Sequence, residues 1–190
     1  MKLITLVFMI AVIIFADTRE YGMFASTFAI IGTVRLFMIL IVSSNNFIAL
    51  YVAREGMSRI LFVLTAQPKT EVSVESGIKY FFQSSFASAI LLIGIALVFA
   101  GTQEFNFTEI RWVLRNEPLT IVTSLGFGLI TIALLFKISA FPGHFWAVDV
   151  YRGPTASVLT MFAVVVKRAA FMVRFNVFLE FITILYVNFG

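Results

Sequence analysis

Long apolar runs separated by short polar connections extend along most of the chain. A helix needs about 20 mostly apolar residues to cross a bilayer. Runs of roughly that length occupy residues 23–44, 47–66, 76–101, 119–137 and about 155–176. None of them shows the strict alternation of a half-buried strand. The pattern therefore predicts an all-α fold, a polytopic transmembrane helix bundle of about six or seven helices.

The two ends of the chain fit this pattern less well than its middle. Lys2 to Ala16 is a short apolar run, typical either of a signal peptide or of a retained helix, and we expect a retained helix. Residues 177–190 are apolar but too short to cross alone, so they extend the last helix or begin another. We therefore divide the chain into an N-terminal helix and loop at 1–22, a helical unit at 23–176 and a tail at 177–190.

The composition supports a membrane protein and excludes several classes of function. Hydrophobic residues make up 61% of the chain and charged residues 13%, whereas soluble domains have about 45–50% and about 25%. The net charge of +4 is modest, so we interpret the basic residues as membrane anchors rather than as a nucleic-acid surface. The chain has no cysteine and a single histidine. This excludes disulfides, thiolate-held iron–sulfur clusters and a bis-histidine haem site on this chain.

Charged residues inside apolar spans are costly in lipid and mark candidate functional sites. Glu55 could exchange protons in the bundle interior, or could form an ion pair with Arg59 four residues further on. Lys79 lies in the first turns of its span, where a lysine usually reaches toward the headgroups. Lys167 lies in the middle of the last span. Because a lysine cannot easily reach the headgroups from there, we expect Lys167 to face the protein interior.

A fourth candidate, Lys137, ends an apolar run and is followed by Pro142, Gly143 and His144. Proline and glycine interrupt backbone hydrogen bonds, so a break at membrane depth must be packed in protein or line a wet cavity. We predict a broken helix at residues 137–154. A lone histidine is usually structural, but His144 lies between two lysines and could pass protons between them. Charges beside a broken helix are typical of ion and proton transport.

Two runs of the chain resemble a known family of membrane proteins. The run from Phe136 to Gly153, FKISAFPGHFWAVDVYRG, resembles the broken seventh helix of the antiporter-like subunits of respiratory complex I (NADH:ubiquinone oxidoreductase), above all the subunit 2 type. The run from Glu71 to Ala96 resembles the sixth helix of the same subunits, and Asn116-Glu117-Pro118 fits the connection that follows. The resemblance covers roughly residues 20–175 and extends to order, spacing and residue type together.

The resemblance implies a membrane-arm subunit that takes part in proton translocation coupled to electron transfer from NADH to ubiquinone. It implies a relay of protonatable residues, namely Glu55, Lys79, Lys137, His144 and Lys167. The chain would be a component of the H+-translocating NADH:ubiquinone reductase without a redox centre or metal of its own. FMN, the iron–sulfur clusters and ubiquinone would be held by other subunits.

The chain departs from the family pattern at three points. It has Arg54 and Arg59 around Glu55 where the family has apolar residues, and Gly143 where the family has a bulky residue. The family also has two inverted five-helix repeats, whereas this sequence covers one, with its broken helix at 137–154. We therefore expect a second chain to supply the C-terminal repeat, beside the other complex I membrane-arm subunits and membrane lipids and without nucleic acid.

Two other functions are compatible with the same residues. The chain could be a non-pumping structural half-subunit of complex I, which Arg54, Arg59 and Gly143 favour. It could also be a subunit of a cation/proton antiporter or of a membrane-bound hydrogenase, because these share the fold. The 23 phenylalanines are typical of an AT-rich genome. We therefore expect the mitochondrial inner membrane, with the bacterial plasma membrane as the alternative.

Overall fold

The computed structural model describes residues 32–34, 36–116, 120–140, 144–160 and 167. The N-terminal segment 1–22, the tail 177–190, Pro142 and Gly143 lie outside the described residues. Within these ranges the chain is helical, and its one β-type pairing is an isolated bridge between Asn46 and Asn106. The all-α prediction is thereby confirmed.

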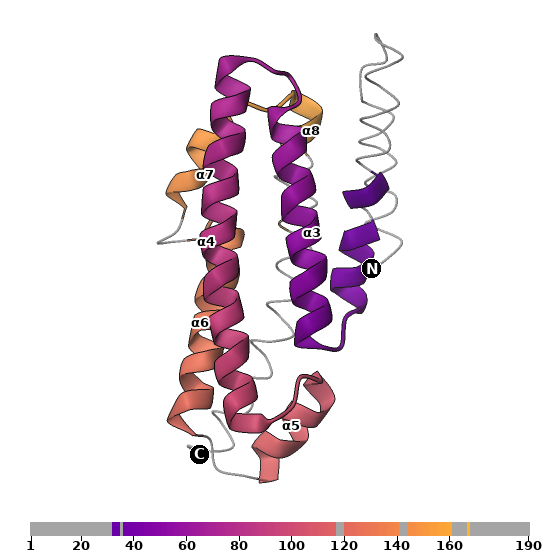
Figure 1. The fold of residues 1–190 in the computed structure, drawn as a ribbon, viewed down its shortest axis with the longest axis vertical. Coiled ribbons are helices and arrows are strands. Elements are labelled where there is room, and N and C mark those ends of the chain that lie inside the picture. The colour runs from indigo at the N-terminus through magenta and orange to yellow at the C-terminus, as the bar shows by residue number, and fades with distance from the viewer. Residues whose placement is uncertain (1–31, 35, 117–119, 141–143, 161–166, 168–190) are drawn as a thin grey trace.

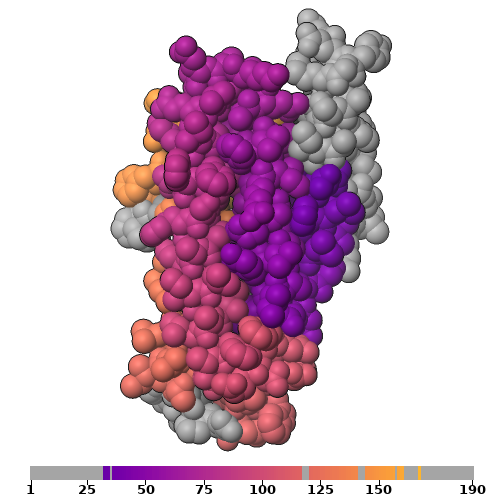
Figure 2. Space-filling model, viewed as in Figure 1, coloured from indigo at the N-terminus to yellow at the C-terminus, as the bar shows by residue number. Residues whose placement is uncertain are grey.

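One long helix, α4 (Glu71–Thr102), forms the centre of the bundle and contacts four other helices (Figure 1). It packs against α3 (Phe47–Ala66) and α6 (Ile121–Lys137), and also contacts α5 (Phe107–Asn116) and α7 (Phe145–Val150). A short helix, α8 (Ala156–Thr160), follows α7. Residues 32–34 and 36–43 are also helical, and in the space-filling view they lie beside α3 on the side away from α4 (Figure 2).

Helix boundaries agree with the sequence prediction where polar residues mark them clearly. Helix α3 has the predicted bounds, because the Asn46 side chain accepts a hydrogen bond from the amide of Ile48 and so caps the helix. Helix α4 begins at Glu71 rather than at the predicted residue 76, because Thr70 caps it. Helix α6 begins at Ile121, close to the predicted start at 119.

The polar connection between the runs at 76–101 and 119–137 contains helix α5, which the sequence pattern did not predict. This helix has one apolar face, with Ile110 and Leu114 buried and Trp112 69% exposed. An amphipathic helix of 10 residues is too short to resemble a span. Its 3.6-residue periodicity is what distinguishes it from a loop.

Length and hydropathy together identify one described helix, α4, as able to cross a membrane. Helix α6 is apolar, but its 17 residues lie at the lower limit for a span. Helix α3 has 20 residues but carries Arg54, Glu55 and Arg59. The predicted spans at 47–66 and 119–137 therefore form helices that do not meet this criterion by themselves.

The inward face of α4 is smaller and more polar than its outward face. Its buried residues follow a spacing of three and four: Ser73, Ser76, Gly77, Tyr80, Ser84, Ala87, Ser88, Leu91, Gly94, Ile95, Val98 and Thr102. Large apolar side chains such as Phe82 and Phe86 are exposed on the surface of this chain. Lipid is as apolar as leucine, so large apolar side chains gain little by leaving lipid for a contact between helices. Helices in membranes therefore associate through small and weakly polar residues.

The backbones of α4 and α6 approach each other closely at two glycines. A Cβ atom added at Gly126 would lie 2.8 Å from the amide nitrogen of Val98 and 2.9 Å from the carbonyl oxygen of Gly94. A Cβ added at Gly94 would lie 2.9 Å from the carbonyl oxygen of Gly126. Both positions therefore require the absence of a side chain, and this contact fixes the register between α4 and α6.

Backbone hydrogen bonds connect the start of α3 to the start of α5, at the end of the bundle opposite the α3–α4 turn. The amide of Phe47 donates to the carbonyl of Phe105 at 3.0 Å, and the amide of Phe107 donates to the carbonyl of Asn45 at 3.1 Å. The Asn45 side chain also donates to the Asn106 side chain at 3.0 Å. The start of α3 and the start of α5 are therefore connected into one unit, which we call the α3–α5 joint.

The capping of α4 gives a testable consequence. The Thr70 hydroxyl accepts from the amide of Ser73 at 3.2 Å, and the Ser73 hydroxyl accepts from the amide of Thr70 at 2.9 Å. We expect Thr70→Ala to lower the free energy of unfolding by about 1 kcal/mol, the typical worth of an N-cap side chain. Unfolding in mixed micelles, followed by circular dichroism, would measure it. Thr70→Ser keeps the hydroxyl and should retain most of the stability; equal losses in both variants would contradict the capping explanation.

Candidate functional site

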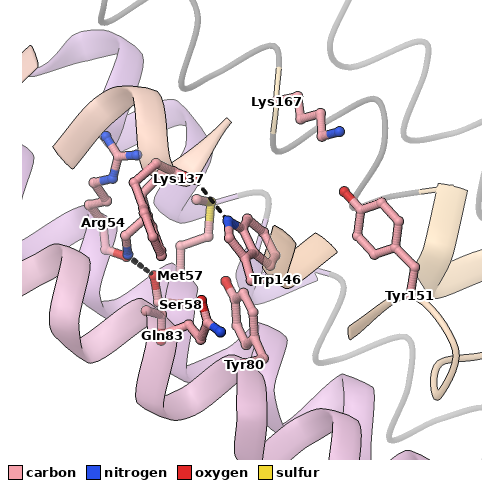
Figure 3. A pocket seen from close by; sticks show the side chains of 11 residues that line it. Arg54, Met57, Ser58, Tyr80, Gln83, Lys137, Trp146, Tyr151 and Lys167 are labelled. Carbon is pink, nitrogen blue, oxygen red and sulfur yellow. Dashed lines mark hydrogen bonds between the residues drawn. The ribbon is translucent and has the colours of Figure 1, made fainter. Parts of the chain in front are cut away.

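A cavity of about 20 Å³ lies between α3, α4, α6 and α7 (Figure 3). That volume holds about one or two water molecules. The side chains that line the cavity include three cations and several hydrogen-bonding groups: Arg54, Met57, Ser58, Tyr80, Gln83, Ser84, Phe136, Lys137, Trp146, Tyr151 and Lys167. Two of the predicted relay residues, Lys137 and Lys167, therefore share one cavity.

Lys137 is held in the cavity by a hydrogen bond across two helices. Its Nζ atom donates to Oγ of Ser58 at 2.8 Å. The Ser58 hydroxyl is buried and itself donates to the carbonyl oxygen of Arg54, one turn earlier in α3, at 3.0 Å. Because its proton is used on the carbonyl, the Ser58 oxygen is oriented as an acceptor for Lys137. Lys137 is also the last residue of α6, where a positive charge interacts favourably with the helix dipole.

The backbone leaves the helical conformation directly after Lys137. Helix α6 ends there, and Ser139 has a left-handed backbone with φ of 59°. The chain is helical again from Phe145. The predicted interruption at 137–154 therefore contains a short helix, whereas its expected centre, Pro142 and Gly143, is outside the described residues.

Trp146 fixes α7 against the cavity. Its indole Nε1 donates a hydrogen bond to the carbonyl oxygen of Phe136 at 2.9 Å. The indole thereby supplies a hydrogen-bond donor to a carbonyl near the end of α6. The Trp146 ring lies 5.9 Å from the ring of Tyr80 and 6.4 Å from the ring of Phe136, measured between centroids. Tyr80 and Trp146 are both buried. The wall of the cavity is therefore made of rigid aromatic groups whose positions depend on α4, α6 and α7 together.

Lys167 reaches the same cavity from beyond α8. Its Nζ atom lies 5.4 Å from the centroid of the Tyr151 ring. A cation over an aromatic face is attracted by the ring quadrupole, with a free energy of about 0.5–2 kcal/mol depending on its exposure to water. Tyr151 therefore provides Lys167 with a favourable electrostatic contact.

Arg54 is the third cation at the cavity and the most deeply buried. Its relative exposure is 3%, and its Nε atom has no hydrogen-bond partner within the described part of the chain. An arginine cannot release its proton in a protein, so this buried charge is permanent. Arg54 is the sequence neighbour of Glu55, and in the structure it also lines the cavity together with Lys137.

The other predicted relay residues do not line this cavity, although the Glu55 carboxylate is near enough to act electrostatically on Arg54 and Lys137. Glu55 is close to Arg59, four residues further on, with 3.9 Å between Oε2 and Nη2. Lys79 forms an ion pair with Glu75 at 2.6 Å, and both side chains are exposed. His144 is exposed, and its ring centroid lies 4.2 Å from that of Phe145. None of Glu55, Lys79 and His144 is among the described residues that line the cavity.

Sequence reasoning missed Ser58 and Tyr80, which contribute polar groups to the cavity. Ser58 lies four residues after Arg54 and therefore on the same face of α3. Tyr80 belongs to the small and polar stripe of α4, between Ser76 and Ser84. Polar residues at helical spacing could have identified both positions, since polar residues inside a membrane bundle face its interior.

Comparison with known proteins identifies similar chains. A family model described as NADH:quinone oxidoreductase/Mrp antiporter, TM, matches residues 44–189. NADH-quinone oxidoreductase subunit N of Wolbachia sp. subsp. Brugia malayi is 41% identical over 141 residues, which are 73% of this chain and 30% of that protein. NADH-ubiquinone oxidoreductase chain 2 of Metridium senile is 37% identical over 151 residues, which are 76% of this chain and 39% of that protein. The chain thus spans about a third of the length of these relatives.

Solved structures show the same arrangement of helices. A chain of respiratory complex I from Thermus thermophilus with bound aureothin superimposes with a TM-score of 0.76 at 26% identity. The match covers 90% of this chain and 38% of that one. A chain of the membrane-bound sulfane sulfur reductase, an archaeal respiratory membrane complex, matches with a TM-score of 0.74 at 24% identity and shows the shared fold alone.

Proposed function

We propose that this chain, which belongs to the NADH:quinone oxidoreductase/Mrp antiporter transmembrane family, is a membrane-arm subunit of respiratory complex I that carries protons. The relatives named subunit N and chain 2 support complex I over the antiporter and hydrogenase alternatives. The observation that carries the proton-transfer role is the placement of Lys137 and Lys167 at one small polar cavity. Both residues are amines that can bind and release a proton.

The cavity supplies the geometry that proton transfer requires. Ser58 holds Nζ of Lys137 in a fixed position, and Tyr151 holds Nζ of Lys167. A water molecule in the cavity could accept a proton from the Lys137 ammonium and donate one to a neutral Lys167 amine. That exchange leaves Lys137 neutral, Lys167 charged and the water unchanged. Rigid positioning of donor and acceptor is the main contribution a protein makes to such a step.

The remaining relay residues have proposed roles outside the cavity. Glu55 and Lys79 lie on α3 and α4, the two helices that contribute Ser58 and Tyr80 to the cavity wall. We propose that they deliver protons toward Lys137 by way of water, and that His144 takes part on the side of α7. The ion pairs with Arg59 and Glu75 would have to open for this to occur.

Membership of this family supports a multi-pass membrane protein, and the relatives named NADH-quinone oxidoreductase subunit N support a component of an oxidoreductase complex. We propose that FMN, iron–sulfur clusters and ubiquinone are bound by other subunits. The second chain expected to supply the C-terminal repeat stays a prediction. The mitochondrial inner membrane also stays a prediction, and relatives such as that from Wolbachia favour a bacterial membrane as the alternative.

Replacing Lys167 by Met tests the proton-transfer role. Methionine keeps the approximate length and the apolar part of the side chain but cannot carry a proton. We expect Lys167→Met to lower the number of protons moved per NADH oxidised by the reconstituted complex. Lys69→Met, which removes a lysine in the exposed α3–α4 turn, is the matched control and should change nothing.

The same measurement distinguishes proton transfer from a scaffold role. A non-pumping structural subunit would give a complex of normal size and normal proton stoichiometry in Lys167→Met. Loss of the whole complex, monitored by native electrophoresis, would show that Lys167 acts in assembly. A lower proton yield in an intact complex is the result that the proposed function requires.

A further inference from the structure

The cavity has an excess of positive charge that the relay does not explain. Arg54, Lys137 and Lys167 all line it, and within the described part of the chain no aspartate or glutamate does. In Figure 3 Arg54 and Lys137 lie on one side of the cavity, and Lys167 and Tyr151 on the other. Cations that share a small buried space repel one another, and each also loses its hydration. A further negative charge at the cavity would make the arrangement more favourable.

Arg54 cannot resolve this imbalance by changing its own charge. A lysine can become neutral, whereas a guanidinium stays charged in every protein environment. Among the residues that the structure describes, the buried Arg54 Nε has no hydrogen-bond partner, and leaving a charged donor unsatisfied costs more than leaving a neutral one. The Glu55 carboxylate attracts Arg54 and Lys137 electrostatically, but it also lies 3.9 Å from Arg59 and does not line the cavity, so one negative charge faces several cations.

The hydrogen-bond donors at the cavity are suited to an anion. Lys137 uses one of its three N–H bonds on Ser58, which leaves two for another acceptor. The Gln83 side chain carries an amide with two further donors. The indole N–H of Trp146 already donates to the Phe136 carbonyl, so at the cavity the ring acts as an apolar wall. Donors from α3, α4 and α6 therefore surround one small space.

We propose that this cavity binds one small monovalent anion of the halide class, held by Nε of Arg54 and Nζ of Lys137. The volume of about 20 Å³ admits a single ion of that size and excludes larger organic anions. The bound anion offsets the permanent charge of Arg54, and it competes with water for the space between the two lysines. The site depends on geometry and charge alone, so it does not require the proposed function to be correct.

Bromide quenching of Trp146 fluorescence tests the site directly. The chain has two tryptophans, of which Trp146 lines the cavity and Trp112 is exposed. In the Trp112→Phe background of the full chain in nanodiscs, sodium bromide replaces sodium gluconate at constant ionic strength. We expect quenching that saturates and is reversed by chloride. Quenching that rises linearly with bromide and is insensitive to chloride would be collisional and would overturn the proposal.

Arg54→Met and Arg59→Met form a matched pair on the same helix. We expect Arg54→Met to abolish the saturable quenching. Arg59→Met should retain it, because Arg59 is 76% exposed and lies away from the cavity. Saturable quenching that persists in Arg54→Met would show that the anion does not bind at Arg54. The readout uses neither NADH nor a proton gradient, so its failure leaves the proton-transfer proposal untouched.

A conservative variant keeps the test decisive if Arg54→Met does not fold. Arg54→Lys keeps the positive charge but loses the planar guanidinium. We expect it to raise the apparent Kd for bromide by about tenfold, which corresponds to the loss of about one charged hydrogen bond. An unchanged Kd in Arg54→Lys would place the anion elsewhere and overturn the proposal.

Discussion

Replacing Lys137 by Met is expected to reduce proton transfer through this chain by about 100-fold or more, because a positioned proton donor typically contributes that much. The methionine side chain can occupy the same space beside Ser58 but cannot hold a proton. The number of protons that the complex moves per NADH oxidised should therefore fall by the number that this chain carries. Acidification of reconstituted vesicles, measured together with NADH consumption, gives this ratio.

Ser58→Ala is the informative companion to Lys137→Met. It removes the hydroxyl that accepts from Nζ of Lys137 at 2.8 Å and leaves the lysine in place. We expect proton transfer to continue more slowly, because Lys137 can still carry a proton but is held less precisely. The proton yield of Ser58→Ala should therefore lie between that of Lys137→Met and that of the unaltered chain. A normal proton yield in Lys137→Met would contradict the relay and favour the structural half-subunit.

Gly126→Ala is expected to destabilise the bundle by about 3 kcal/mol, at the upper end of the range for overpacking. The new Cβ would lie 2.8 Å from the amide nitrogen of Val98 and 2.9 Å from the carbonyl oxygen of Gly94. Neither is a flexible side-chain atom, so the two helices must separate along their contact. Unfolding in mixed micelles and the amount of assembled protein in membranes would both report the loss.

Gly128→Ala provides the control, since it adds the same methyl group two residues further along α6. A Cβ at Gly128 meets nothing within 4 Å. Alanine also favours helix over glycine by up to about 1 kcal/mol. We therefore expect Gly128→Ala to be neutral or stabilising. If both variants lost the same stability, helix propensity or lipid packing, rather than the close α4–α6 contact, would explain the effect.

The fold could be predicted well from sequence because helices in lipid depend on local patterns. The apolar run of α3 is bounded by Asn46 and by Gln67-Pro68, and the helix has the predicted bounds. Helix α5 was missed because it is short and amphipathic rather than apolar throughout. The resemblance to the antiporter-like complex I subunits is confirmed by the family match over residues 44–189 and by the named relatives.

The site could be predicted only in part, because sequence gives the depth of a residue better than the direction of its side chain. Lys137 was placed beside a break, and α6 does end there. Lys79 follows the same family pattern, yet its side chain turns to Glu75 one helical turn away. Ser58 and Arg54 line the cavity because α3 packs against α4 and α6. The spacing of residues along one helix does not determine that packing. The roles of Glu55, Lys79, Lys137, His144 and Lys167 stay predictions.

The α3–α5 joint has a mechanical consequence for the cavity. It fixes α3 at Phe47, and Ser58 lies 11 residues further along that helix, a distance of about 16 Å at 1.5 Å per residue. A tilt of about 4° around the fixed end therefore displaces Ser58 by about 1 Å, which is enough to break a hydrogen bond of 2.8 Å. A small rotation of α3 about this end of the bundle would therefore be enough to break the contact between Ser58 and Lys137.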